Sequence, residues 1–359
     1  MRERIYSLDW LRGLMAISIM IYHLTGGVFF ANDSSVLLGR LGIYGVSIFF
    51  ILSGLSMSIV YSNYIVDAQT AVFFFIRRIF RIWPLLWICI FLALVPLYIQ
   101  GESISIISII ANMTTVFGFI KPDAYINTGA WSIGNEMVYY SLTPIVIGFY
   151  SKNKIYGNLF VFLSFVMSVI FSFYLLKSSD TIASQWVTYV NPFNNLFLYA
   201  SGIAIFYNLN TFKIGHVLNL CLFLIPVLFF LYYPVSGDQI HIVTGWNRLM
   251  FMFFSIIFVI SFYKFDLYQY APKVIAYPLE LFGVATYGVY LLHPIIALYL
   301  KNGLKLIGID NVYLVFTITC ILTVIIALIS YNVYETKLMA IGKRLTNKEG
   351  GFMAFLESK

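Results

Sequence analysis

Apolar runs of about 20 residues recur from one end of the sequence to the other, and a run of this length spans a lipid bilayer as an α-helix. Hydrophobic residues make up 61% of the 359 residues and charged residues only 10%, whereas soluble domains average about 45–50% and about 25%. So few charges cannot cover a surface that faces water. The sequence therefore predicts an all-α polytopic membrane protein. It excludes a secreted soluble enzyme, a nucleic-acid-binding domain and a coiled coil.

Ten of these runs are candidates for spans. They cover approximately residues 10–30, 41–61, 83–99, 131–150, 159–176, 192–207, 216–233, 246–263, 279–300 and 312–334. The stretch 104–120 is weaker, and its Ser, Thr and Asn content favours a re-entrant or interfacial position. We therefore expect about ten transmembrane helices.

The distribution of charge supports this count. The net charge is +7, from 22 Lys and Arg against 15 Asp and Glu, and an excess of Lys and Arg marks cytoplasmic loops. With a cytoplasmic N-terminus and ten spans, 16 of the 22 basic residues face the cytoplasm. Both termini are therefore expected there, with a membrane domain over 1–335 and a basic cytoplasmic tail over 336–359. The three cysteines lie in apolar runs without metal-ligand spacing, so no metal site is predicted.

The first span carries ionisable residues that a membrane penalises, which makes a functional site the default hypothesis. Asp9 and Arg12 are three residues apart and can pair on one helix face. Arg12 and His23 are eleven apart, which returns within roughly 20° of the same direction and places them about 16 Å apart along the axis. We expect both to face one shared cavity. The alternative is an Asp–Arg pair at the helix start and a histidine bonded to a neighbouring helix.

The second span and the segment before the third span are also distinctive. Small residues in the second span predict close helix packing; they are Gly39, Gly42, Gly45, Ser53, Gly54 and Ser56. Next, a short helix is expected to carry Arg77, Arg78 and Arg81, with Arg77 and Arg81 on one face. Pro84 is expected to start the third span, where its missing N–H is harmless. The arginines are either an anchor to anionic lipid or a phosphate site.

Two later spans carry further polar residues. Ser132 and Glu136 are four apart and share a face at the start of the fourth span. Glu136 is either a functional acid or a structural partner for a buried cation. In the ninth span, His293 is followed by Pro294, which removes a helical donor and permits a kink. A packed kink is the alternative to a functional role for His293.

Five sequence motifs and a closing residue pair occur in a fixed order between residues 8 and about 335. They are LDWLRG (running on to His23), GVSIFFILSG, RRIFRIWP, WSIGNE and YGVYLLHP, followed by Tyr334–Glu335. Together they resemble the acyltransferase 3 family of bacterial integral-membrane acyltransferases. The resemblance implies a ten-helix domain that moves an acyl group, usually acetyl, from cytoplasmic acyl-CoA to a hydroxyl on a lipid-linked or surface glycan. It also implies a multi-pass protein of the bacterial cytoplasmic membrane.

The resemblance extends to individual residues. It implies catalytic roles for Arg12, His23 and Glu136, with His23 as a general base or as a transient acyl carrier. Acyl-CoA, acetyl-CoA in the first instance, is the expected co-substrate, and no permanently bound cofactor is expected. Its expected contacts are Arg12, Arg77, Arg78 and Arg81, and the residues expected to bind or support substrate are Asp9, Trp131, Ser132, Tyr287 and His293.

Mechanism and partners follow from these assignments. Glu136 is expected to orient the His23 imidazole if its span lies beside the first. The expected partners are the lipid bilayer, acyl-CoA and a glycan or lipid-linked saccharide, with no nucleic acid. The alternative function is a flippase or exporter of a glycan intermediate, because buried Arg, His and Glu also suit a proton-coupled carrier. The sequence shows no internal repeat, which counts against a transporter of the inverted-repeat kind.

Overall fold

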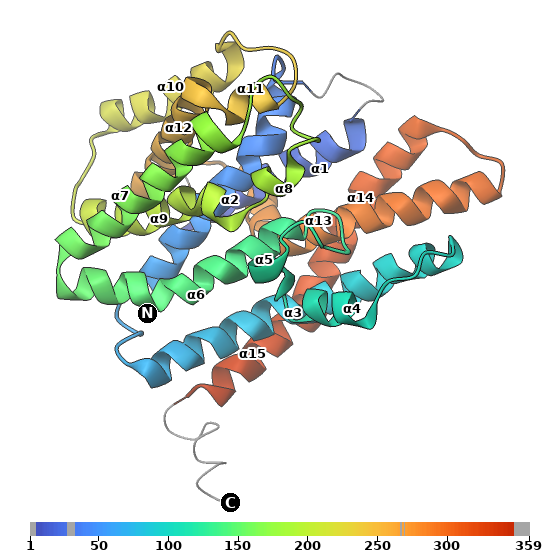
Figure 1. The fold of residues 1–359 in the computed structure, drawn as a ribbon, viewed down its shortest axis with the longest axis horizontal. Coiled ribbons are helices and arrows are strands. Elements are labelled where there is room, and N and C mark those ends of the chain that lie inside the picture. Colours follow the sequence, from blue (N-terminus) through green and yellow to red (C-terminus); the bar gives the residue numbers. More distant parts are fainter. Residues whose placement is uncertain (1–4, 27–32, 266–267, 269, 348–359) are drawn as a thin grey trace, which may run out of the picture.

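The computed structural model describes residues 5–26, 33–265, 268 and 270–347, and this part of the chain is helical, without a β-strand (Figure 1). Its longer helices are α1 (Tyr6–Thr25), α2 (Leu37–Tyr61), α3 (Ala68–Ile99), α6 (Trp131–Lys152), α7 (Lys154–Ile170), α9 (Pro192–Leu209), α10 (His216–Tyr232), α12 (Gly245–Lys264), α13 (Lys273–Leu306) and α14 (Val312–Ser330). Shorter elements are α4 (Ile106–Met113), α5 (Phe117–Ile120), α8 (Trp186–Tyr189), α11 (Ile240–Val243), α15 (Thr336–Leu345) and the π-helical turns η1 (Phe171–Leu175) and η3 (Tyr331–Glu335).

The all-helical, multi-pass class predicted from the sequence is confirmed. Among the described residues, six helices are long and apolar enough to cross a membrane: Leu37–Tyr61, Ala68–Ile99, Lys154–Leu175, Gly245–Lys264, Lys273–Leu306 and Val312–Leu345. Every predicted span overlaps a helix, although residues 27–30 at the end of the first lie outside the described residues. The number of ten spans and the side of each terminus stay predictions.

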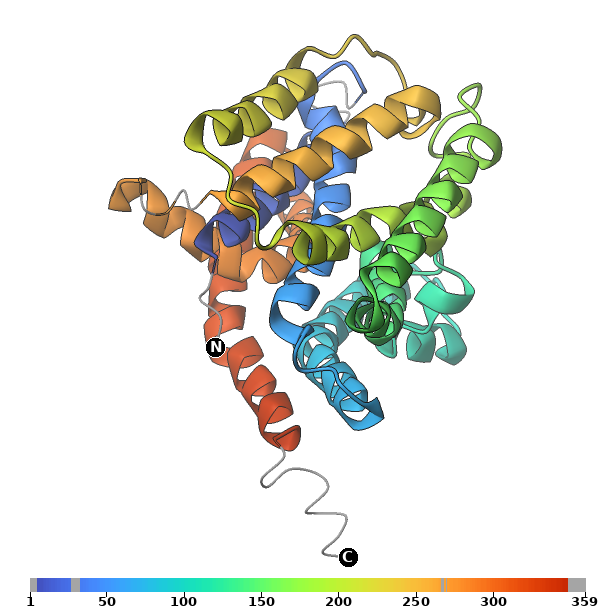
Figure 2. The same cartoon turned by 90° about the vertical axis from the view of Figure 1, so that its left-hand side faces the viewer.

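α2 lies in the middle of the bundle (Figure 2). Its most apolar stretch is 78% buried, against 17% for the stretch in Val312–Leu345. The outer helices instead expose large apolar side chains, among them Phe162, Val217 and Ile325. A soluble monomer rarely exposes so much apolar surface, so these side chains form the surface that faces lipid.

Glycines allow α2 to pack closely at its centre. A Cβ atom on Gly54 would lie 2.0 Å from the Tyr199 carbonyl oxygen of α9, and one on Gly202 would lie 2.0 Å from the Ile51 carbonyl oxygen. Only residues without a side chain allow backbones to approach this closely. The predicted packing role of Gly54 is therefore confirmed.

The prediction that Pro84 starts the third span is wrong. α3 begins sixteen residues earlier, after an Asp67 cap whose Oδ1 accepts a hydrogen bond from the Thr70 N–H at 2.7 Å, and it continues through Pro84 to Ile99. A well-capped start allows a helix to propagate, and neighbouring helices tolerate a proline inside a membrane helix. The three arginines consequently lie on the same continuous helix as the third span.

The last helix, α15, packs against the first half of α3. A Cβ atom on Gly342 of α15 would lie 2.8 Å from the Phe80 Cβ, so the two helices are in direct contact. α15 has two basic residues, Lys343 and Arg344, in its last turn. The first part of the predicted basic tail is therefore a helix that packs on the bundle. Residues 348–359 of the predicted tail lie outside the described residues.

Candidate active site

A cavity of about 580 Å³ lies between α1, α2, α3, α6 and α13. Its described lining residues include three arginines and two acidic residues: Asp9, Arg12, Arg78, Arg81 and Glu136. Hydroxyl groups line it too, from Ser53, Ser56, Ser132, Tyr140, Thr286, Tyr287, Tyr290 and Tyr331. Cationic groups outnumber carboxylates, so the cavity suits an anionic ligand.

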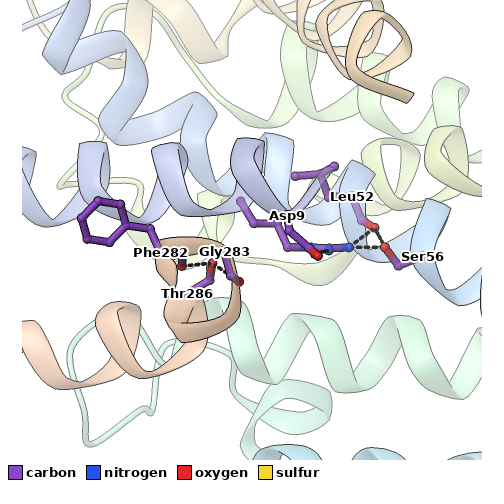
Figure 3. Close-up of polar contacts among 7 residues, drawn as sticks. Asp9, Leu52, Ser56, Phe282, Gly283 and Thr286 are labelled. Atoms are coloured by element: carbon purple, nitrogen blue, oxygen red, sulfur yellow. Dashed lines mark hydrogen bonds and ion pairs between the residues drawn. The ribbon is translucent and has the colours of Figure 1, made fainter. Parts of the chain in front are cut away.

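Arg12 bridges its own helix and α2. Its Nη1 donates to Asp9 Oδ1 at 2.7 Å, and its Nη2 donates to Ser56 Oγ and to the Leu52 carbonyl oxygen at 3.4 Å. Figure 3 shows these acceptors together, with Thr286 of α13 nearby and bonded back to Gly283. The three-residue spacing of Asp9 and Arg12 therefore produces the predicted pair, and the guanidinium lies at the cavity wall.

The arginines of α3 divide between two surroundings. Arg78 and Arg81 line the cavity, whereas Arg77 is not among its lining residues. The Arg77 Nε donates to Thr346 Oγ1 at 2.6 Å, and its guanidinium lies 4.4 Å from the Tyr64 ring centroid. Residues three apart share a helix face, and adjacent residues diverge by about 100°. The structure thus pairs Arg81 with Arg78, whereas the four-residue spacing predicts a pair with Arg77.

Arg78 has donor capacity to spare. Its Nη2 donates to the Tyr61 hydroxyl at 2.8 Å, and its guanidinium carbon lies 5.2 Å from the Tyr61 ring centroid and 5.9 Å from that of Tyr140. Its buried Nε has no hydrogen-bond partner among the described residues. Arg81 donates from Nη1 to a weak acceptor, Met339 Sδ, at 3.0 Å. Arg78 therefore has a buried, unpaired N–H, and the side chains of Arg78 and Arg81 both line the cavity.

Glu136 is held by hydroxyl groups. Its Oε1 accepts hydrogen bonds from Ser53 Oγ at 2.5 Å and from the Tyr140 hydroxyl. The small size of Ser53 and Ser56 predicts packing, and Tyr140 is not among the site residues expected from the sequence. Tyr140 is four residues after Glu136 and so shares its helix face, which is the signal that could have found it.

Ser132 and Tyr290 close one end of the cavity. Their hydroxyl oxygens lie 2.8 Å apart, and the Tyr290 hydroxyl also donates to the Gly129 carbonyl oxygen at 3.0 Å. Tyr287, one turn earlier on α13, lines the cavity and donates to the Ile82 carbonyl oxygen at 2.7 Å. Trp131 does not line the cavity, but it is buried behind the lining residue Phe50 and also packs against Trp186 and Tyr189.

The imidazoles of His23 and His293 form a pair beyond Tyr290. Their Nδ1 and Nε2 atoms lie 2.9 Å apart, and the ring centroids are 5.2 Å apart. His293 is 1% exposed, whereas the His23 side chain is exposed. Neither lines the 580 Å³ cavity. Tyr290 links the two places, because it lines the cavity and its ring centroid lies 6.3 Å from that of His293.

This arrangement differs from two expectations. Arg12 and His23 were expected to face one cavity, but only Arg12 lines it. Glu136 was expected to orient the His23 imidazole, but it bonds to hydroxyl groups on α2 and α6, and His293 of α13 bonds to His23. The reason is that α13, and not α6, packs most extensively along α1.

Two glycines permit this packing. A Cβ atom on Gly13 would lie 2.9 Å from the Gly283 nitrogen, and one on Gly283 would lie 2.6 Å from the Asp9 carbonyl oxygen. His23 follows Gly13 by ten residues, and His293 follows Gly283 by ten. The two helices therefore run parallel and in register, which brings the histidines to the same level.

A family model described as an acyltransferase domain, Acyl_transf_3, matches residues 5–332 of the chain. This range contains the arginine-lined cavity except for Met339, and it contains the histidine pair. No curated protein and no solved structure matches the chain.

Proposed function

The chain belongs to the acyltransferase 3 family, and from this premise we propose that it acetylates a hydroxyl of a lipid-linked or surface polysaccharide, using cytoplasmic acetyl-CoA. The observation that carries the proposal is the cavity whose wall holds Arg12, Arg78 and Arg81. The protein would act in the cytoplasmic membrane of a bacterium. The reaction needs no resident cofactor, because acyl-CoA is a substrate.

The arginines suit the phosphate groups of CoA. A guanidinium presents several N–H donors in a planar fork that matches phosphate oxygens. Arg78 and Arg81 have such groups at the cavity wall. The predicted topology puts this region at the cytoplasmic side, where acyl-CoA is made. The cavity volume also lies within the range of about 300–1,000 Å³ typical of small-molecule sites.

The pantetheine arm would follow α13 inward. The cavity runs along this helix from Gly283 to Tyr290, which is about 10 Å of helix axis. His293 comes one turn later. The gap between Arg12 and His23 is about 16 Å along α1, a length that an extended pantetheine chain bridges. The thioester would then lie near Tyr290, at the entrance to the histidine pair.

His23 would act as the general base. Its Nε2 takes the proton of the acceptor hydroxyl while that oxygen forms a bond to the thioester carbonyl carbon. The C–S bond breaks, and the CoA thiolate takes the proton back from Nε2. The products are the acetyl ester and free CoA thiol. A covalent acyl-histidine would instead appear as a mass increase on the peptide that contains His23.

The test uses proteoliposomes that contain the protein, labelled acetyl-CoA and lipid-linked glycan. Label on the glycan supports the proposal, whereas glycan movement without label supports a carrier. Arg78→Ala combined with Arg81→Ala should raise the KM for acetyl-CoA by roughly 10- to 100-fold, because a hydrogen bond to a charged group contributes about 1.5–3 kcal/mol. Arg77→Ala is the matched control and should leave the KM for acetyl-CoA unchanged, because Arg77 does not line the cavity and bonds to Thr346 instead. An equal effect of both variants would refute the donor site.

A further inference from the structure

The histidine pair contains a buried member that the proposed reaction has not used. His293 is 1% exposed, its Nε2 lies 2.9 Å from His23 Nδ1, and its Nδ1 lies 2.9 Å from the Val289 carbonyl oxygen. We propose that His293 is a positioning residue that holds His23 in the tautomer whose Nε2 is unprotonated and directed at the acceptor hydroxyl. This inference rests on the proposed function, since it assigns a task to His293 within that reaction.

The tautomers follow from the acceptor at one end of the chain of hydrogen bonds. A carbonyl oxygen can only accept, so His293 Nδ1 carries the proton that it donates to Val289. In a neutral imidazole the other nitrogen is then an acceptor. His293 Nε2 therefore accepts from His23 Nδ1–H. His23 Nε2 is left with the lone pair that a general base requires.

The local sequence supports this orientation. Pro294 lacks an N–H, so the carbonyl of Tyr290 one turn earlier has no helical donor. Two carbonyl groups, those of Val289 and Tyr290, thus lie on the side of the ring that bears Nδ1. In the other tautomer of His293, an unprotonated Nδ1 would face both carbonyl oxygens, which are also acceptors. The Gly13–Gly283 contact holds α1 and α13 close enough for the second hydrogen bond.

The arrangement also serves the step after proton abstraction. When His23 Nε2 has taken the hydroxyl proton, the imidazolium still donates from Nδ1 to His293 Nε2. A third group that orients a base through its second nitrogen is a recurring device in acyl transfer. Here a neutral imidazole takes that position. His293 touches His23 and not the reacting atoms, so its effect on the reaction acts through the orientation of His23.

Two substitutions separate an acceptor role from a packing role. His293→Gln keeps a carbonyl oxygen that can accept from His23 Nδ1–H, whereas His293→Phe fills the same space without an acceptor. His293→Phe should lower kcat by roughly 10- to 100-fold with an unchanged KM for acetyl-CoA, as expected for loss of a correctly oriented base. His293→Gln should recover kcat at least severalfold. Equal kcat in the two variants, or a rise in KM without a fall in kcat, would overturn the proposal.

If a variant fails to fold, the proposed tautomer of His23 can be measured in the unsubstituted protein. Two-bond ¹H–¹⁵N correlation spectra of the histidine-labelled protein in nanodiscs report which ring nitrogen is protonated, and His23→Gln assigns the signals. Protonated Nδ1 and unprotonated Nε2 on His23 support the proposal, and the opposite tautomer overturns it. Full activity in His23→Gln would instead remove His23 from the proposed reaction. Activity lost in that variant but kept in His293→Phe would remove only this inference.

Discussion

The contact of α1 with α13 at two glycines connects packing with chemistry, and Gly283→Ala tests this connection. A Cβ atom at Gly283 would lie 2.6 Å from the Asp9 carbonyl oxygen, and an ordinary van der Waals contact begins near 3.4 Å. The helices must therefore separate by about 0.8 Å at this level. If they separate as rigid bodies, the distance from His23 to His293 grows from 2.9 Å to about 3.7 Å. A donor–acceptor distance of about 3.6 Å is already too long for a hydrogen bond.

Gly283→Ala is expected to remain folded and to lose most of its activity. Overpacking costs about 1–3 kcal/mol, and replacing glycine by alanine inside a helix returns about 1 kcal/mol. The net loss of stability is small, but a misplacement of about 1 Å can lower a rate by roughly 100-fold. The assay is acetyl transferred to glycan per amount of protein in the membrane. The thermal midpoint in detergent is measured in parallel.

Gly303→Ala on the same helix is the matched control, because no atom of the described residues outside its own stretch of helix lies within 4 Å of the Cβ that it would add. It should keep full activity and unfold at the same or a slightly higher temperature. Activity within twofold of the unsubstituted protein in Gly283→Ala would refute the reasoning. So would an equal loss in both variants.

Three further predictions concern the framework around the cavity. Glu136→Gln keeps an acceptor for its hydroxyl partners and should reach normal membrane abundance. Glu136→Ala leaves buried donors unpaired and should lower the free energy of unfolding by about 1–3 kcal/mol. Thermal unfolding in detergent compares the two variants. Gly202→Ala places a Cβ 2.0 Å from a carbonyl oxygen and should abolish accumulation in the membrane, while Gly148→Ala, with nothing within 4 Å, should accumulate normally on immunoblots. Arg40, 2% exposed, donates to carbonyl oxygens including that of Phe230, so Arg40→Met should lower the thermal midpoint; an unchanged midpoint would show that these carbonyl groups find other donors.

Spacing along one helix predicted which residues share a face. The Asp9–Arg12 pair was found in this way, and so was the close packing at Gly54. Spacing does not reveal which way a face points, because contacts with distant helices decide that. For this reason Arg77 rather than Arg78 was paired with Arg81. The same limit applies to Ser53 and Ser56, which line the cavity although their size alone indicated packing.

The hydrogen-bond partner of His23 could not be predicted from the sequence either. His293 follows it by 270 residues, and no local pattern relates two residues at that separation. The position of Pro84 inside α3 has a similar origin. The helix starts at a local cap, Asp67, but it continues past Pro84 because neighbouring helices compensate for the hydrogen bond that the proline removes. Helices and the apolar class are local properties, whereas the cavity is a product of packing.

The 270-residue separation of the paired imidazoles has a consequence for biosynthesis. Ribosomes add about 5–20 residues per second, so α1 enters the bilayer on the order of tens of seconds before α13 is made. During that interval His23 lacks its bonding partner, and Gly13 lacks the neighbour that fills its surface. A nascent chain therefore cannot assemble the histidine pair until nearly all of it has been translated. Products of premature termination before α13 would insert helices yet contain no complete site.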